Sequence, residues 1–166
     1  MKDDLISKLK KLDIVYRKPV QLKHAGAAEF YIDVKKAYGY PDVLALISDS
    51  LWEMIDKETN VIATEGYGGL SPASILSLKY RLNLTLVRDQ PKNHGKAGFI
   101  DGYIPNKGDK VSIIDDVFTT EASLMRIKEV INSTGAEILG CYVVVKRGEG
   151  ELGIPLSYLL IPEDLV

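Results

Sequence analysis

The stretch that decides the fold is VSIIDDVFTTEAS, residues 111–123. An apolar run here ends in Asp115 and Asp116, and the chain then passes through hydroxyl residues into a predicted helix over about 120–134. A buried strand of this kind delivers its last side chains to one edge of a sheet. Helix capping gives no reason for two acids at the end of an apolar strand, so the pair favours a ligand-binding role.

The start of that helix predicts a phosphate cradle. Its unpaired backbone N–H groups and the positive end of its dipole attract anions, and the hydroxyls of Thr119, Thr120 and Ser123 add donors. Asp115 and Asp116 could then hold the ribose hydroxyls of a sugar phosphate or a hydrated Mg²⁺. A simpler alternative stays open, in which Thr119 or Thr120 merely caps the helix.

Helical and strand patterns alternate on both sides of this stretch. Apolar spacing predicts helices over 42–56 and 71–80, besides an amphipathic first helix within 1–16. Apolar, β-branched runs predict strands over 60–66, 84–88, 110–116 and 137–147, and the polar region over 89–110 is poor in periodicity. This order predicts an α/β fold, a mostly parallel central sheet flanked by helices. In such sheets, ligands bind beyond the carboxyl ends of the strands.

The composition restricts the class of protein. The 166 residues, of which 46% are hydrophobic and 27% charged, suit a single globular domain. A formal net charge of −2 gives no basic field, so we expect no nucleic acid partner. No apolar run is long enough for a membrane span, and the charged N-terminus is a poor secretory signal. The single cysteine, Cys141, is expected to be reduced and buried, which indicates a cytoplasmic protein.

A second candidate site follows another predicted strand, in TEGYGG at 64–69. Its three glycines let backbone amides approach an anion closely. The segment matches neither the dinucleotide-binding fingerprint nor the phosphate-loop motif. GLSPA, at 69–73, lacks the final glycine of a hydrolase nucleophile elbow, so a serine hydrolase is disfavoured. The simpler alternative is a strand-to-helix turn that needs a positive φ.

A third candidate segment is RDQPKNHGK at 88–96, where three cations and one aspartate give a local excess of two positive charges. Cations on a loop suit neutralisation of a polyanion during a reaction. Arg88, Lys92 and His94 are the candidates of interest. Most charged runs are simply solvated, and a lone histidine is more often incidental than catalytic.

Together, these three segments resemble the type I phosphoribosyltransferases and, within them, the orotate phosphoribosyltransferases. Residues 111–123 are similar to the family's signature for 5-phosphoribosyl-1-diphosphate (PRPP), an apolar strand followed by Asp-Asp-Val and Thr-Thr-Gly-x-Ser. Residues 88–95 match the spacing of the orotate enzymes' loop, R-K-x-x-K-x-H-G. The resemblance spans roughly residues 16–150. It implies the type I phosphoribosyltransferase fold, with an N-terminal helix and small hood over 1–40 and an α/β core over 41–166.

The resemblance also implies a reaction and its residues. The 5-phosphoribosyl group would pass from PRPP to N1 of orotate, with Mg²⁺ as cofactor, giving orotidine 5′-monophosphate and pyrophosphate. Asp115 and Asp116 would hold the ribose hydroxyls and the Mg²⁺ shell, and Lys92 and His94 would act on the pyrophosphate side. The implied 5′-phosphate contacts are Thr119, Thr120, Glu121, Ala122 and Ser123. The implied pyrophosphate contacts are Glu65, Gly66, Tyr67, Gly68 and Gly69, with Arg88 on the loop.

The hood and the end of the last core strand are implied to receive the base. Lys23, Phe30 and Arg147 would contact orotate, with Arg147 matching its carboxylate charge, and Tyr31 lies in the same hood segment as Phe30. In relatives the loop reaches the neighbouring subunit's site, which implies a homodimer with shared active sites. No membrane partner is implied.

Four residues depart from the family pattern. Glu121 replaces a glycine of the phosphate loop, and Asp89 replaces a lysine after Arg88, so both place negative charge near a bound anion. Gly68 stands where some relatives have a lysine, and Lys146 where an aspartate is usual. Two alternatives therefore stay open: a phosphoribosyltransferase for another base, such as a purine, and a non-catalytic relative that binds PRPP or a nucleotide as a signal.

Overall fold

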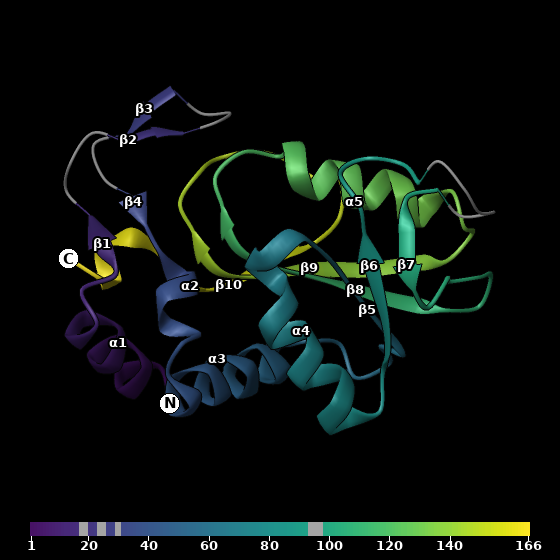
Figure 1. Ribbon diagram of the computed structural model, residues 1–166. Coiled ribbons are helices and arrows are strands. Elements are labelled where there is room, and N and C mark those ends of the chain that lie inside the picture. Colours follow the sequence, from purple (N-terminus) through teal and green to yellow (C-terminus); the bar gives the residue numbers. More distant parts are fainter. Residues whose placement is uncertain (17–19, 23–25, 29–30, 93–97) are drawn as a thin grey trace.

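The computed structural model describes residues 1–16, 20–22, 26–28, 31–92 and 98–166. Its centre is a six-stranded sheet in the order β10-β9-β8-β5-β6-β7 (Figure 1). All neighbouring strands are parallel except β7, which runs antiparallel to β6. The strands are β5 (Val61–Glu65), β6 (Asn83–Val87), β7 (Ile100–Gly102), β8 (Lys110–Phe118), β9 (Glu137–Lys146) and β10 (Leu156–Leu160). The predicted α/β fold with a mostly parallel sheet is confirmed.

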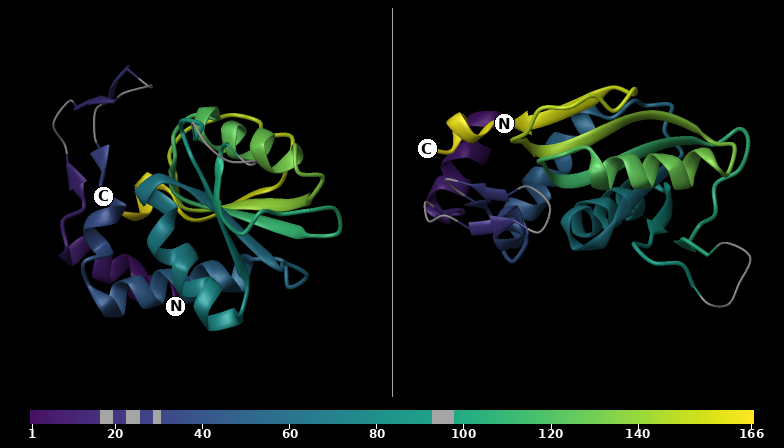
Figure 2. Two further views of the ribbon diagram at one scale, coloured as in Figure 1. Left: turned by 45° about the vertical axis from the view of Figure 1, so that its right-hand side comes forward. Right: turned by 90° about the horizontal axis from the view of Figure 1, so that it is seen from above.

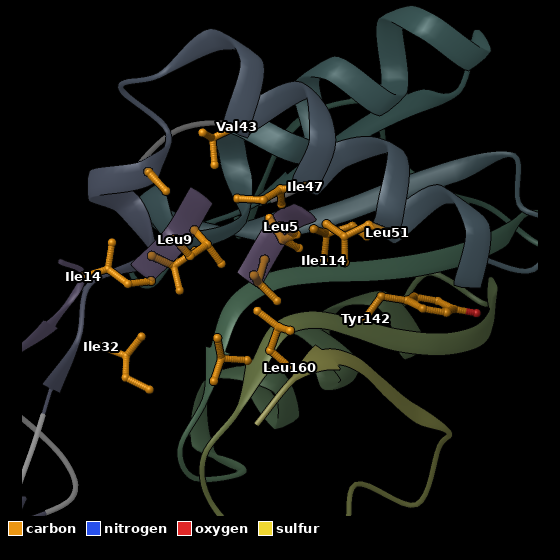
Figure 3. Close-up of a cluster of buried hydrophobic side chains, with 14 of the residues drawn as sticks. Leu5, Leu9, Ile14, Ile32, Val43, Ile47, Leu51, Ile114, Tyr142 and Leu160 are labelled. Atoms are coloured by element: carbon orange, nitrogen blue, oxygen red, sulfur yellow. The ribbon is translucent and has the colours of Figure 1, made fainter. Parts of the chain in front are cut away.

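Helices cover both faces of this sheet (Figures 1 and 2). On one face lie α1 (Lys2–Lys11), α3 (Pro41–Met54) and α4 (Gly66–Tyr80), and on the other lies α5 (Ala122–Asn132). Side chains alternate along β8, so that Ile114 packs in the first core cluster and Ile113 in the second. Figure 3 shows the first cluster, including Leu5, Leu9, Ile47, Leu51, Ile114, Tyr142 and Leu160.

Local sequence explains where these helices begin and end. Pro41 occupies the first turn of α3, where its missing N–H removes no hydrogen bond. Gly135, which follows α5, has a φ of 83°, a left-handed conformation that suits glycine. Arg81 ends α4 in the same region, with a φ of 57°, where a side chain is unfavourable.

The N-terminal segment forms small separate pairs of strands. β1 (Val15–Tyr16) pairs antiparallel with β4 (Tyr31–Ile32), and β2 (Val20–Leu22) pairs with β3 (Gly26–Ala28). The β2–β3 pair projects beyond β1 and β4, away from the central sheet (Figure 1). The short helix α2 (Val34–Ala37) then returns the chain to the sheet, with the Asp33 side chain accepting a hydrogen bond from the Lys36 N–H at its start.

The structure corrects several predicted boundaries. The helix expected over 71–80 begins at Gly66, so the glycine segment forms its first turn. The strand expected to end at the aspartates continues to Phe118, and the region expected to be a loop over 89–110 contains β7. β10 and the terminal 3₁₀ helix (Pro162–Asp164) were not predicted.

Two further observations concern the cysteine and the absence of membrane-spanning helices among the described residues. Cys141 is fully buried as expected, and that burial raises the pKa of its thiol to about 12. Within the described parts of the chain, no helix combines the length and apolar character needed to cross a bilayer.

Candidate active site

The carboxyl ends of β5 and β8 lie side by side at one edge of the sheet. The two strands are parallel neighbours, with Val61 opposite Val111 and Ala63 opposite Ile113. The glycine segment after β5 and the aspartates near the end of β8 are therefore brought together. The Thr64 hydroxyl strengthens this junction by donating a hydrogen bond of 2.9 Å to the Ile114 carbonyl.

Gly68, in the glycine segment, lies directly against both aspartates. A Cβ at this position would lie 2.4 Å from Asp116 Oδ1 and 2.6 Å from Asp115 Oδ1. Glycine therefore lets the first turn of α4 rest against both carboxylates without a shift of either. The simpler alternative for 64–69 was a strand-to-helix turn that needs a positive φ. Gly66 forms such a turn, with a φ of 64°.

The two aspartates differ in their surroundings. Asp115 Oδ1 accepts the Asp116 N–H at 2.9 Å, and Asp116 Oδ1 accepts the Val117 N–H at 2.8 Å. Burial, reinforced by the neighbouring Asp116 charge, raises the pKa of Asp115 well above its usual value. Asp116 is only 8% exposed but is paired with a cation.

That cation comes from the N-terminal segment. Lys35 Nζ, on α2, lies 2.8 Å from Asp116 Oδ2. Burial lowers the pKa of Lys35, but the Asp116 carboxylate outweighs this and leaves the pKa raised. Tyr38, just beyond α2, donates from its hydroxyl to the Gly68 carbonyl at 2.8 Å. Burial, with the charges of the two aspartates, raises the pKa of Tyr38, so its hydroxyl stays a donor.

The predicted phosphate cradle surrounds the start of α5. The residue preceding the helix is Glu121, and no described side chain caps its N–H groups, so the interpretation of Thr119 or Thr120 as a mere cap is wrong. Both threonines are half-buried between β8 and α5. The Glu121 carboxylate turns to the chain after β9, where its Oε1 accepts the Glu151 N–H at 3.0 Å. First-turn backbone donors can therefore still face an anion.

Glu65 and Arg126 link the two helix starts. Arg126 Nε lies 3.0 Å from Glu65 Oε2, and its Nη2 lies 2.8 Å from Oε1, a bidentate pair. Glu65 precedes α4 and Arg126 lies in α5. The pair balances a carboxylate that would otherwise oppose an anion at α4.

The cations after β6 pair with an unpredicted partner. Arg88 Nη1 lies 2.9 Å from Asp101 Oδ2, and Lys92 Nζ pairs with Asp101 Oδ1. Hydrogen bonds from Lys92 and then Arg88 hold the pKa of Asp101 below its usual value. The Lys92 N–H also donates to the Gly98 carbonyl at 2.6 Å.

The other predicted residues are more scattered. Lys23, Phe30 and His94 lie outside the described residues. Tyr31 lies in β4, its ring centre 6.3 Å from that of Tyr16. Arg147 follows β9, and its N–H donates to the Phe118 carbonyl at 2.8 Å, beside the phosphate cradle.

The remaining predicted residues lie in α4 and α5. Tyr67, in the first turn of α4, is 82% exposed. Gly69 lies within the same helix. Ala122 and Ser123 occupy the first turn of α5. The segment 69–73 is helical throughout, which also excludes the strand-to-helix elbow of a serine hydrolase.

The oxygen donors at this edge of the sheet suit Mg²⁺. The described residues contain no group of three or more histidine, cysteine or acidic side chains able to hold a metal. Asp115 and Asp116 supply neighbouring carboxylate oxygens at this edge. Two carboxylates fit Mg²⁺, which keeps several waters and shares its coordination with substrate phosphates.

Sequence reasoning missed four residues of this site, namely Lys35, Tyr38, Asp101 and Arg126. Lys35, Tyr38 and Asp101 come from segments that carry no motif, and Arg126 lies in α5 just beyond the signature of residues 111–123. Only Tyr38 and Lys35 gave a weak signal, since they follow the hood segment directly.

Comparison with known proteins assigns the chain to a family. No family model matches. The chain is 35% identical over 150 residues to an orotate phosphoribosyltransferase of Methanopyrus kandleri, covering 87% of this chain and 80% of that protein. It is 31% identical to that of Methanothermobacter thermautotrophicus, over 99% and 93% of the two chains. The crystal structure of the Aeropyrum pernix orotate phosphoribosyltransferase superposes with a TM-score of 0.83 at 28% identity, over 97% and 95% of the two chains. These relatives, together with the fold, place the chain in the orotate phosphoribosyltransferase family.

Proposed function

We propose that the protein transfers the 5-phosphoribosyl group of PRPP to N1 of orotate, giving orotidine 5′-monophosphate and pyrophosphate. The observation that carries the proposal is the contact of Gly68 with Asp115 and Asp116. It joins a glycine-rich helix start to a pair of carboxylates beside a second helix start. Such a site can hold both anionic ends of one sugar phosphate.

Each part of the site has a role in this reaction. Backbone donors and hydroxyls over 119–123 would hold the 5′-phosphate, and the first turn of α4 with residues 65–69 would receive the pyrophosphate. Asp115 and Asp116 would accept the ribose hydroxyls between them. Fixing the two ends leaves the bond at C1 as the part that changes, which lowers the entropic cost of reaching a transition state with oxocarbenium character.

The pyrophosphate gains charge as it leaves and needs compensation. Lys92 and His94 would supply it, with Arg88 nearby, and the unpaired amides at the start of α4 would add donors. Mg²⁺, when bound, would neutralise part of the same charge. Asp115 and Asp116 would hold that ion through its water shell.

The base would approach from the side of the N-terminal segment and the end of β9. Lys23, Phe30 and Tyr31 would line that side. Arg147 would pair with the orotate carboxylate, a match that a purine lacks. These roles make the segment over 1–40 a hood on the α/β core over 41–166.

We also propose a cytoplasmic homodimer in which residues 88–96 act at the neighbouring subunit's site. Within one chain, Arg88 and Lys92 pair with Asp101, which supports action elsewhere than at this chain's aspartates. Mixing inactive Lys92→Ala and Asp116→Asn proteins should restore activity in heterodimers, because one of the two sites would contain both native residues. Absence of recovery in demonstrated heterodimers would exclude shared sites.

The first experiment is direct. Purified protein with orotate, PRPP and Mg²⁺ should lose orotate absorbance, whereas a control without PRPP should not. Parallel reactions with purine bases test the base. Consumption of a purine alone would indicate a phosphoribosyltransferase for that base. If the protein binds PRPP but consumes no base, the result would favour a non-catalytic relative that binds PRPP as a signal.

A further inference from the structure

The short helix α2 places two side chains against the candidate site. Lys35 contacts Asp116 near the end of β8, at 2.8 Å. Tyr38, one residue beyond the helix, contacts the Gly68 carbonyl in the first turn of α4, also at 2.8 Å. The N-terminal segment therefore touches both the carboxylate pair and the glycine turn.

The Asp116 carboxylate is held from two sides. The Val117 N–H fixes Oδ1 at 2.8 Å, and the Lys35 ammonium fixes Oδ2 at 2.8 Å. A carboxylate has about four acceptor positions, so both oxygens keep capacity for a further donor such as a hydroxyl. The rotation that would turn these acceptors away is opposed by Lys35.

The negative charge of the Asp115 and Asp116 carboxylates also needs a neighbouring positive charge. Asp115 and Asp116 are neighbours whose Oδ1 atoms both lie against Gly68, so their like charges are close together and repel. Position 68 offers no compensating charge in this chain, because it is a glycine, and a Cβ there would lie within 2.6 Å of both carboxylates. Lys35 brings the compensating charge from α2 instead.

We propose that Lys35 is a positioning residue for the ribose of PRPP, which fixes Asp116 in the orientation that accepts the ribose hydroxyls. The inference rests on the proposed function. It adds a residue of the hood to the sugar-phosphate site, so that the hood serves PRPP as well as the base.

The neighbouring Lys36 provides a matched control. It carries the same charge on the same helix, but its ammonium donates to the Asp13 carbonyl at 3.2 Å. Replacing either lysine removes one positive charge from the protein, and only Lys35 contacts Asp116.

The test measures PRPP and pyrophosphate binding by calorimetry, both with Mg²⁺. Lys35→Met should bind PRPP about tenfold more weakly. The substitution removes the charge-assisted hydrogen bond from Lys35 to Asp116, the residue that would hold the ribose hydroxyls. Pyrophosphate has no ribose and should bind within about twofold of wild type. Lys36→Met should match wild type for both ligands, and Lys35→Arg should recover part of the PRPP affinity.

A double-mutant cycle with Asp116→Asn tests whether Lys35 acts on PRPP binding through Asp116. In that background, Lys35→Met should cause no further loss of PRPP affinity. Unchanged PRPP affinity in Lys35→Met would overturn the proposal. Equal losses of affinity for PRPP and pyrophosphate would also overturn it, because they would indicate a general charge effect. Circular dichroism and thermal unfolding check the fold, and Lys35→Gln, which keeps a donor without the charge, replaces any variant that does not fold.

The same titrations separate this inference from the proposed function. A wild-type protein that binds PRPP but consumes no base overturns the proposed reaction, while the Lys35 comparison remains decisive. A wild-type protein that does not bind PRPP overturns both.

Discussion

Gly68 rests so closely on Asp116 that a single added carbon would lie 2.4 Å from the carboxylate oxygen Oδ1. Two segments that are far apart in the sequence meet at this contact. The first turn of α4 could hold the pyrophosphate end of the substrate, and the end of β8 could hold its ribose. The contact therefore sets the spacing between the two.

Replacement of Gly68 by alanine should weaken PRPP binding at least about tenfold and destabilise the protein by ~1–3 kcal/mol. Helix propensity alone favours alanine by about 1 kcal/mol, so overpacking must exceed that gain. Calorimetry and urea unfolding measure both effects. Gly39→Ala is the control, since a Cβ there lies 3.4 Å from the Lys36 carbonyl. Wild-type affinity in Gly68→Ala would show that the turn can move without consequence.

Asp101→Asn should tighten pyrophosphate binding severalfold, because Arg88 and Lys92 lose the carboxylate that competes for them. Inhibition by pyrophosphate measures this, with Asp49→Asn as a control that breaks the exposed pair with Lys79. Weaker inhibition would mean that Asp101 orients the two cations for the ligand.

The pH dependence of the Asp101 pairs has a definite sign. The pKa of Asp101 is lowered in the folded protein, so the pairs stabilise it above the ordinary aspartate pKa of about 3.9. That contribution is lost only as the pH falls through the lowered pKa. Between neutral pH and about pH 5, stability differences between wild type and Asp101→Asn should therefore stay constant.

Glu121→Ala should leave PRPP affinity within about twofold of wild type, because the carboxylate accepts the Glu151 N–H rather than facing the phosphate cradle. Hydrogen exchange of the Glu151 amide should become faster, whereas Glu121→Gln, which keeps an acceptor, should retain protection. A clear gain in PRPP affinity would show that the carboxylate repels the 5′-phosphate.

Arg126→Gln should weaken PRPP and pyrophosphate binding by about tenfold, since it leaves the Glu65 carboxylate unbalanced beside the start of α4. Adding Glu65→Gln should restore part of the loss by removing that charge. Lys79→Gln, which breaks an exposed pair, is the control. A double variant no better than Arg126→Gln would contradict the charge argument.

Arg81→Gly should be more stable than Arg81→Ala by about 1 kcal/mol, because position 81 has a φ of 57° at the end of α4. Both variants remove the same charge, so their difference reports the left-handed conformation alone. Urea unfolding measures it. Equal stabilities would mean that the helix end relaxes out of this conformation.

The sequence was sufficient for features that depend on local pattern. The apolar run before Asp115 and Asp116 identifies a buried strand, and the end of that strand identifies the edge of the sheet. The glycines of 66–69 were placed correctly after a strand but not recognised as helical, because glycine is a poor helix former. Their helix starts there because Gly68 and Gly69 pack on β8.

Features that depend on tertiary pairing could not be predicted in the same way. β7 is three residues long and exists only through its pairing with β6. Lys35 and Lys36 are identical in type and adjacent, and only the direction of α2 gives one of them Asp116 as a partner. Asp101 and Arg126 likewise acquire their partners from the fold.

The Thr64–Ile114 hydrogen bond joins residues that are 50 positions apart. The chain between β5 and β8 contains α4 and β6, so their pairing closes a long loop, and such long-range closure is slow relative to helix formation. During refolding, helical circular dichroism should therefore return before ligand binding does. Recovery of PRPP binding would then report the pairing of β5 with β8 rather than the formation of the helices.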